Sequence, residues 1–206
     1  MAYRVKTSRL IPRELRRLYG YLSGALFETH DSLHTLEELY GDSSVVDLLN
    51  TTAPAFFAHV KEILVRDIIL SISRVTDKPG NPRSKPPQEN LTLSRLVLEL
   101  SPQKHPKLHA RLEKKWKRIE KLSAPIRTYR HKVIGHADKV VCLKPTRKLG
   151  KKISISLIRR TLEKIEDFLN TFDYAFTKGE TGYHSIGHYG NVGDFVAYLK
   201  KNPGDC

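Results

Sequence analysis

The chain has 206 residues, of which 39% are hydrophobic, and its 36 Lys and Arg outnumber its 22 Asp and Glu to give a formal net charge of +14. A chain of this length can bury one sizeable core, so we expect a single domain over residues 1–206 and exclude two independent ones. A surface with this excess of positive charge repels itself unless an anion approaches, so polyanions are the expected partners.

Membrane and disulfide-rich classes are also excluded by the sequence. No run approaches the roughly 18 to 20 apolar residues that a membrane span requires, and the N-terminus lacks the apolar core of a secretory signal. The two cysteines, Cys142 and Cys206, have no partner at metal-ligand spacing. We therefore expect a cytoplasmic protein with no membrane partner and no zinc–cysteine site.

The first half of the chain predicts two long helices. Residues 12–40 place leucines at spacings of three and four, which is one apolar stripe on a helix. Residues 52–76 carry a broader apolar face, which predicts the most buried helix of the bundle. Residues 77–90 combine four prolines with a glycine in a polar run, so we expect a mobile loop without regular structure.

The second half is also mainly helical. Helical spacing of apolar residues recurs in three segments, 91–100, 106–138 and 157–177. Pro125 should kink the long basic helix, and the β-prone runs within 139–156 predict a small hairpin or extended excursion. We therefore expect an all-α bundle with its core at about 12–178, followed by a loop and a short helix over 179–206.

Cations, imidazoles and a carboxylate are densest between residues 127 and 138. Metal-independent cleavage of RNA needs a base for the 2′-hydroxyl proton, an acid for the leaving 5′-oxygen and fixed positive charge beside the phosphorus. Histidine titrates near neutrality, and a guanidinium stays charged and can contact two phosphate oxygens. Arg130 and His136 are therefore candidate catalytic residues.

The string formed by Arg130, His131 and His136 resembles the Arg-x(4-6)-His motif of the HEPN superfamily of helical ribonucleases. The segment RTYRHKVIGHAD is similar to the abortive-infection AbiU-type branch. The residues before it add to this likeness: ILSISRVTDK, then the Pro-rich run, then TLSRLVLEL. This resemblance runs from about Ala53 to Asp138, and its specific part is the segment from Arg130 to Asp138.

The resemblance implies a HEPN-like bundle and a metal-independent endoribonuclease of toxin or antiviral-defence type, which leaves a cyclic phosphate and needs no cofactor. It assigns acid–base work to His136 and the phosphate clamp to Arg130. His131 takes the polar second position, where it either orients Arg130 or joins in proton transfer. The resemblance further implies a homodimer, with an acidic antitoxin or a nucleotidyltransferase-like protein as candidate partners.

Four neighbours of the motif are candidates for holding the RNA: Arg127, Lys132, Asp138 and Lys139. The spacing within the motif raises a geometric difficulty, because six residues of ideal helix leave Arg130 and His136 roughly 120° apart. Gly135 offers a way to re-aim the second side chain, since glycine lets a chain leave a helix.

Simpler interpretations stand beside these. His136 could be a histidine favoured by the dipole at a helix end, and Arg127 and Lys139 could belong to a solvated basic face. Arg74 and Asp77 could form an ion pair that ends a helix. The alternative function is a non-catalytic module that binds a nucleotide, RNA or a partner protein, and a third is docking on DNA or an acidic antitoxin.

Three histidine pairs stand four residues apart, a spacing that can bind a metal: His30 with His34, His105 with His109, and His184 with His188. None has the supporting ligands, so chance placement is favoured and no metal is expected. Trp116 lies on the apolar line of its helix and is expected in the core. A further hypothesis places four residues of the C-terminal loop beside single-stranded RNA: Tyr183, His184, His188 and Tyr189.

Overall fold

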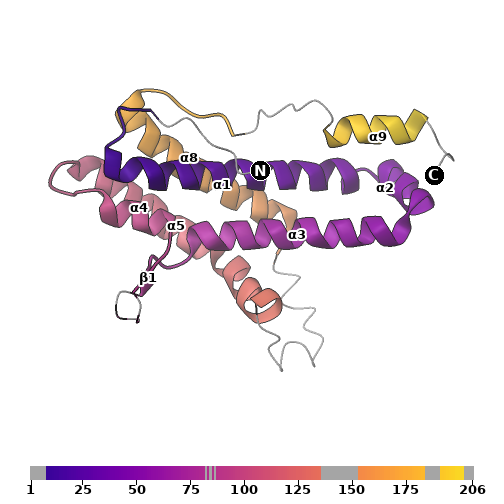
Figure 1. Ribbon diagram of the computed structural model, residues 1–206, viewed down its shortest axis with the longest axis horizontal. Coiled ribbons are helices and arrows are strands. Elements are labelled where there is room, and N and C mark those ends of the chain that lie inside the picture. The colour runs from indigo at the N-terminus through magenta and orange to yellow at the C-terminus, as the bar shows by residue number, and fades with distance from the viewer. Residues whose placement is uncertain are drawn as a thin grey trace.

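The computed structural model describes residues 8–81, 83, 85, 87–135, 153–183 and 191–201. The four longest helices within these ranges are α1 (Arg13–Tyr40), α3 (Pro54–Thr76), α5 (Pro106–Tyr129) and α8 (Ile155–Thr177). Helices α1 and α5 each pack against both α3 and α8, which gives a bundle (Figure 1). The predicted all-α bundle is confirmed.

Shorter helices complete the described part of the chain: α2 (Ser43–Thr52), α4 (Leu93–Glu99), α9 (Val192–Lys201) and the π-helix η1 (Arg130–Gly135). Helix α2 joins α1 to α3. The apolar pattern of the sequence did not predict it, because this helix buries only Val45 and Leu49. A start signal was present, since the Asp42 carboxylate accepts a hydrogen bond of 2.7 Å from the Ser44 amide.

The main core lies between α1, α3, α5 and α8. The leucine stripe of α1 is buried as predicted, and Trp116 of α5 packs against this core. On α8, Phe168 and Phe172 are fully buried, and the Phe172 ring stacks on Tyr19 of α1 at a centroid distance of 5.2 Å. Buried rings of this kind contribute the largest apolar areas in a core.

Helix α3 is less buried than the sequence predicts. Its C-terminal half buries Ile68, Ile69 and Ile72, but Phe56 and Ile63 in its N-terminal half are 62% and 51% exposed. Apolar residues occur all round this helix, and the elements packed against its N-terminal half leave these two uncovered. The expectation that this is the most buried helix is therefore wrong, because apolar content does not fix which sides a bundle covers.

The Pro-rich segment is more regular than expected. Strands β1 (Gly80–Asn81) and β2 (Gln88–Glu89) pair in antiparallel fashion, with Gly80 opposite Glu89. Gly80 has φ +115°, and a Cβ there would meet the Gln88 carbonyl oxygen at 2.0 Å, so the pairing requires glycine. The expectation of no regular element is wrong at the two ends of this loop, because proline removes its own N–H but leaves its neighbours free to pair.

The predicted β excursion at 139–156 falls mostly outside the described residues. Its last residues are helical or cap a helix: Ser154 accepts a hydrogen bond of 3.1 Å from the Leu157 amide, and α8 begins at Ile155. The β expectation is wrong there because the apolar spacing of α8, starting with the buried Ile158, outweighs the local preference of the isoleucines. Among the described residues, no helix is long and apolar enough to cross a membrane.

A buried polar cluster fixes the segment that follows α8. We call Ser23, Asn170, Asp173, Thr181 and Tyr183 the Tyr183 cluster. The Tyr183 hydroxyl lies 3.1 Å from Ser23 Oγ, and the Asn170 side chain donates to the Thr181 carbonyl and accepts from its amide at 3.1 and 3.0 Å. Burial raises the pKa of the Tyr183 hydroxyl.

Because Tyr183 is 1% exposed and its ring lies 4.7 Å from that of Phe27, it cannot stack on RNA in this arrangement. That hypothesis is wrong for Tyr183, since its ring completes the core instead. Three other members of the hypothesis lie outside the described residues: His184, His188 and Tyr189.

Candidate functional site

The candidate motif begins where α5 changes its hydrogen-bonding pattern. Helix α5 runs through Pro125, ends at Tyr129 and passes directly into η1, Arg130–Gly135. A π-helix has i→i+5 bonds and is frequently found at functional sites. The change from ideal α-geometry therefore begins at Arg130 itself, and η1 ends at Gly135.

Three candidate residues after the π-helix lie outside the described residues: His136, Asp138 and Lys139. Their positions relative to Arg130 stay predictions. His131 is exposed on η1, and Lys132 beside it is partly exposed, so both face solvent at the end of the bundle.

The Arg130 side chain is held by an acidic residue from a different helix. Its Nη2 donates to Asp77 Oδ2 at 2.5 Å, and Asp77 directly follows α3 as its C-cap. The two side chains are 30% and 35% exposed, so this ion pair is neither buried nor fully solvated. The Nε of Arg130 is buried and finds no hydrogen-bond acceptor among the described residues. One carboxylate thus orients the guanidinium while a donor remains unused.

Arg127, one turn earlier, is bonded quite differently. Its Nη1 donates to the Thr76 carbonyl at 2.7 Å and to Ser123 Oγ at 2.9 Å, and its Nη2 donates to the Glu120 carbonyl at 3.1 Å. The Thr76 carbonyl is one of the last acceptors of α3, which has no intrahelical partner. Arg127 therefore joins the end of α3 to α5, and these contacts favour a structural role over the RNA contact proposed from sequence.

We call Thr76, Asp77, Arg127 and Arg130 the Arg130 junction. Through it, two arginines of α5 and η1 secure the last residues of α3, more than 50 positions away in sequence. Helical spacing in the sequence favours an ion pair of Asp77 with Arg74 instead, three residues before it. The structure gives the Asp77 carboxylate to Arg130, a long-range contact that helical spacing alone does not indicate.

A hollow of about 360 Å³ lies between α3 and η1, beside the motif. It is lined by α3 together with Tyr129, Val133 and Ile134 of the α5–η1 segment. On its α3 side, Arg66 pairs with Glu62 at 2.6 Å. The motif is therefore next to a partly apolar depression with charged groups along its α3 wall.

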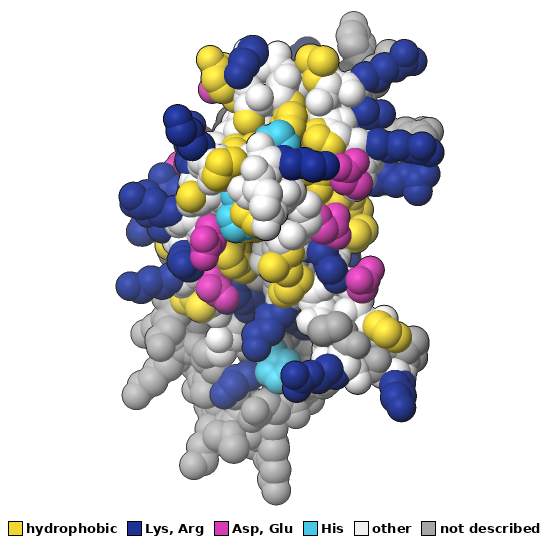
Figure 2. Space-filling view, turned by 90° about the vertical axis from the view of Figure 1, so that its left-hand side faces the viewer, with side chains coloured by type: hydrophobic (Ala, Val, Ile, Leu, Met, Phe, Trp, Pro, Cys, Tyr) yellow, Lys and Arg dark blue, Asp and Glu magenta, His cyan; other side chains and the backbone are white. Residues whose placement is uncertain are grey.

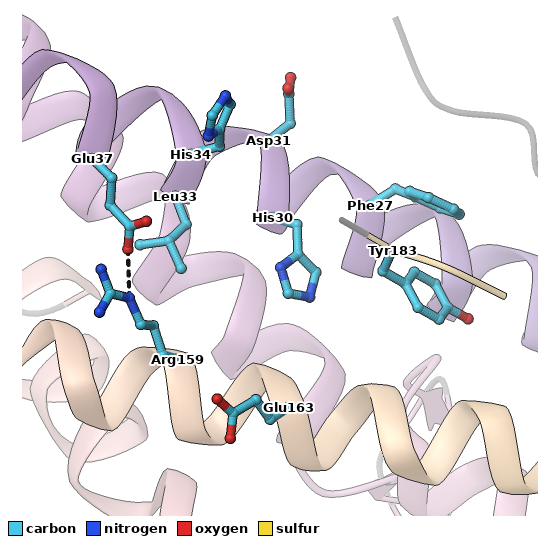
Figure 3. A pocket seen from close by; sticks show the side chains of 9 residues that line it. All are labelled: Phe27, His30, Asp31, Leu33, His34, Glu37, Arg159, Glu163 and Tyr183. Carbon is cyan, nitrogen blue, oxygen red and sulfur yellow. Dashed lines mark hydrogen bonds and ion pairs between the residues drawn. The ribbon is translucent and has the colours of Figure 1, made fainter. Parts of the chain in front are cut away.

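A second pocket, of about 290 Å³, lies between α1 and α8 (Figure 3). His30 points from α1 toward α8, whereas Asp31 and His34 point away from α8 (Figure 3). At one end Arg159 of α8 donates to Glu37 of α1 at 2.8 Å. Because the two imidazoles diverge, this histidine pair does not have the arrangement of a shared metal site.

The other histidine pairs give no metal site in the described ranges. No group of three or more His, Cys, Asp or Glu there could hold a metal ion. The His105 ring packs edge-on against Phe176 at 5.3 Å. His184 and His188 lie outside the described residues.

A family model of HEPN domains, AbiU2, matches residues 14–195. The chain belongs to the AbiU2 family of HEPN domains. No curated protein and no solved structure gave a significant match. The AbiU2 match extends from α1 into α9, well beyond residues 53–138 where the resemblance was noted, and it confirms the predicted superfamily and its abortive-infection branch.

Proposed function

We propose that this AbiU2 HEPN domain is a metal-independent endoribonuclease of toxin or defence type, with Arg130 and His136 as its catalytic residues. The observation that carries the proposal is the environment of Arg130. The guanidinium is oriented by Asp77 at the start of a π-helix, and the Arg130 side chain is 30% exposed. A group held in this way can meet a phosphate without first being ordered.

The proposed chemistry is an internal transesterification. The imidazole of His136 takes the proton of a 2′-hydroxyl, and the 2′-oxygen attacks the adjacent phosphorus. The bond from phosphorus to the 5′-oxygen breaks, and that oxygen takes the proton from the imidazolium of His136, which leaves a 2′,3′-cyclic phosphate, a 5′-hydroxyl and a neutral imidazole. Arg130 stabilises the negative charge that accumulates on the phosphoryl oxygens. In this proposal His131 either orients Arg130 or joins in proton transfer, and the partly exposed Lys132 holds the RNA.

The direct test is cleavage of a single-stranded RNA in the presence of a chelator, with analysis of the product ends. We expect cyclic-phosphate ends from the unchanged protein and a loss of at least about 100-fold in rate for Arg130→Ala and for His136→Ala. The matched controls are Arg160→Ala and His34→Ala, exposed or partly exposed residues of the same types away from η1. Circular dichroism confirms that each variant is folded.

Retained cleavage in both motif variants would refute the catalytic assignment. The alternative is a non-catalytic HEPN module that binds RNA, a nucleotide or a protein with the same residues. It predicts salt-sensitive binding that Arg130→Ala weakens, with no product at any enzyme concentration.

The homodimer and its partners remain part of the proposal. Phe56 and Ile63 lie seven residues apart on the uncovered side of α3 and offer an apolar strip for a second subunit. Light scattering at several concentrations tests this: Ile63→Glu should convert a dimer to a monomer, and Leu98→Glu, at a comparably exposed position of α4, should not. An acidic antitoxin or nucleotidyltransferase-like partner would be detected by co-purification.

A further inference from the structure

The solvent-facing side of α5 carries a line of basic residues that the proposed catalysis does not use. We call it the basic stripe: Lys107, Arg111, Lys114, Arg118 and Lys121. They are spaced by four, three, four and three residues, which on a helix confines them to an arc of roughly 80°. All five are exposed, and the two glutamates of α5, Glu113 and Glu120, lie on the far side of the helix from the middle of this arc.

The cations of the basic stripe differ from the other lysines of α5 in their ion pairing. Within the described ranges, no member of the basic stripe makes an ion pair or a side-chain hydrogen bond. By contrast, Lys115 pairs with Asp167 of α8, and Lys117 pairs with Glu113 at 2.9 Å. Like charges three and four residues apart destabilise a helix, so the stripe accumulates repulsion that a bound anion would relieve.

On one face of the molecule, positive charge is mixed with negative charge. Figure 2 shows Lys and Arg side chains projecting around the margin of one face, with Asp and Glu between them. Net charge alone therefore does not define a binding surface. A continuous line of cations without intervening acidic residues has the character of a polyanion site.

The dimensions of the basic stripe fit a chain of phosphates. It extends over about 21 Å, and neighbouring cations are spaced by about 4.5 to 6 Å along the axis. Its last member, Lys121, is about 14 Å along the same helical rod from Arg130. We propose that the basic stripe binds the phosphate backbone of a single RNA strand outside the scissile linkage. This inference rests on the proposed function for its ligand and adds to it the surface that holds the strand.

The test compares two double variants of equal charge in a His136→Ala parent, so that RNA is not consumed. Lys114→Gln/Arg118→Gln removes two members of the basic stripe, and Lys115→Gln/Lys117→Gln removes two paired lysines beside it. Glutamine is about as good a helix former as lysine and arginine, so the fold should survive in both, as a thermal melt would confirm. The affinity for a fluorescent single-stranded RNA is measured at several salt concentrations.

For the stripe variant, the slope of log affinity against log salt should become shallower by about 1.4, since each lost single-strand phosphate contact accounts for about 0.7. The control variant should keep the slope of its parent. The inference would be overturned if the slope changed equally in both variants, or if it did not change in the stripe variant. Unchanged RNA affinity together with stripe-dependent binding to anionic vesicles or to an acidic protein would also overturn it.

Failure of the nuclease proposal has a different signature. If the unchanged protein does not cleave RNA but stripe-dependent RNA binding is found, the catalytic assignment fails and the basic stripe stands. If the protein cleaves RNA while its RNA binding is independent of the basic stripe, the catalytic assignment stands and the inference about the basic stripe fails.

Discussion

Two polar clusters of this molecule each secure a loop to the bundle, and they do so by different means. The Tyr183 cluster has one carboxylate, that of Asp173, and otherwise uses neutral hydroxyl and amide groups, with Tyr183 itself almost fully buried. The Arg130 junction uses charged groups, of which Arg130 and Asp77 are about one-third exposed. A buried neutral contact has no alternative partner, whereas a partly solvated guanidinium can exchange one anion for another. The first arrangement serves stability, and the second leaves room for the phosphate of the proposed substrate.

The comparison predicts that the largest loss of stability comes from the Tyr183 cluster. Tyr183→Ala should lower the free energy of unfolding by about 3–5 kcal/mol, because it removes a buried ring and a hydroxyl that Ser23 contacts. Urea denaturation measures this. Tyr174→Ala, at a half-exposed position of α8, should change it by less than about 0.5 kcal/mol. Equal losses in the two variants would contradict the structural role of Tyr183.

Within the Arg130 junction, the two arginines should separate stability from activity. Arg127→Ala should lower the free energy of unfolding by about 1–3 kcal/mol, because the Thr76 carbonyl loses its donor. Arg130→Ala should lower it by less than about 1 kcal/mol, since water can replace a partly exposed partner. Urea titrations rank the two variants by their loss of stability, and the RNA-cleavage assay ranks them by their loss of activity. We expect the two rankings to be opposite. A larger stability loss for Arg130→Ala would make it the structural residue.

Alkaline pH should weaken the packing around two buried tyrosines, Tyr19 and Tyr183. Burial raises the pKa of Tyr19 and of Tyr183 above the ordinary value of 10. The neutral phenols are therefore favoured in the folded state, so their stabilisation is complete below pH 10 and falls as the pH rises above it, by about 1 kcal/mol per pH unit for each tyrosine. Chemical denaturation between pH 8 and 11 measures this fall. Tyr183→Phe should show a shallower fall, and an unchanged slope would rule out Tyr183 as its source.

The smallest effect should come from neutralising Asp77. Asp77→Asn keeps an oxygen acceptor for Arg130 but removes the charge, so the free energy of unfolding should fall by under about 1 kcal/mol. Because salt screens exposed charges, the difference from the unchanged protein should shrink in 0.5 M NaCl, as paired thermal melts would show. Glu89→Gln, whose carboxylate lies 3.4 Å from Arg95, is the matched control. A salt-independent loss of several kcal/mol would assign Asp77 to the core instead.

Sequence patterns located most of the helices because apolar spacing is a local property. The leucines of α1 and the phenylalanines of α8 repeat at three and four residues, and both stripes are buried as predicted. The failures have local causes too. Helix α2 was missed because it buries two residues, and the β1–β2 pair was missed because backbone groups make it without a side-chain signal.

The candidate site was only partly predictable. Residue types and spacing pointed to Arg130 and to the need for a departure from ideal helix, but not to a π-helix that begins at Arg130. Nothing in the sequence near Arg127 indicated that its guanidinium would bond the end of α3, because that contact spans 51 positions.

The sequence by itself determined the helical elements, the excess of positive charge and the motif that carries the family likeness, because these depend on neighbouring residues or on simple sums. The tertiary structure decided which face of α3 stays uncovered, which arginine bonds the Thr76 carbonyl and which acidic residue orients Arg130. Those outcomes depend on how distant helices meet in the bundle, and short-range spacing carries no record of that packing.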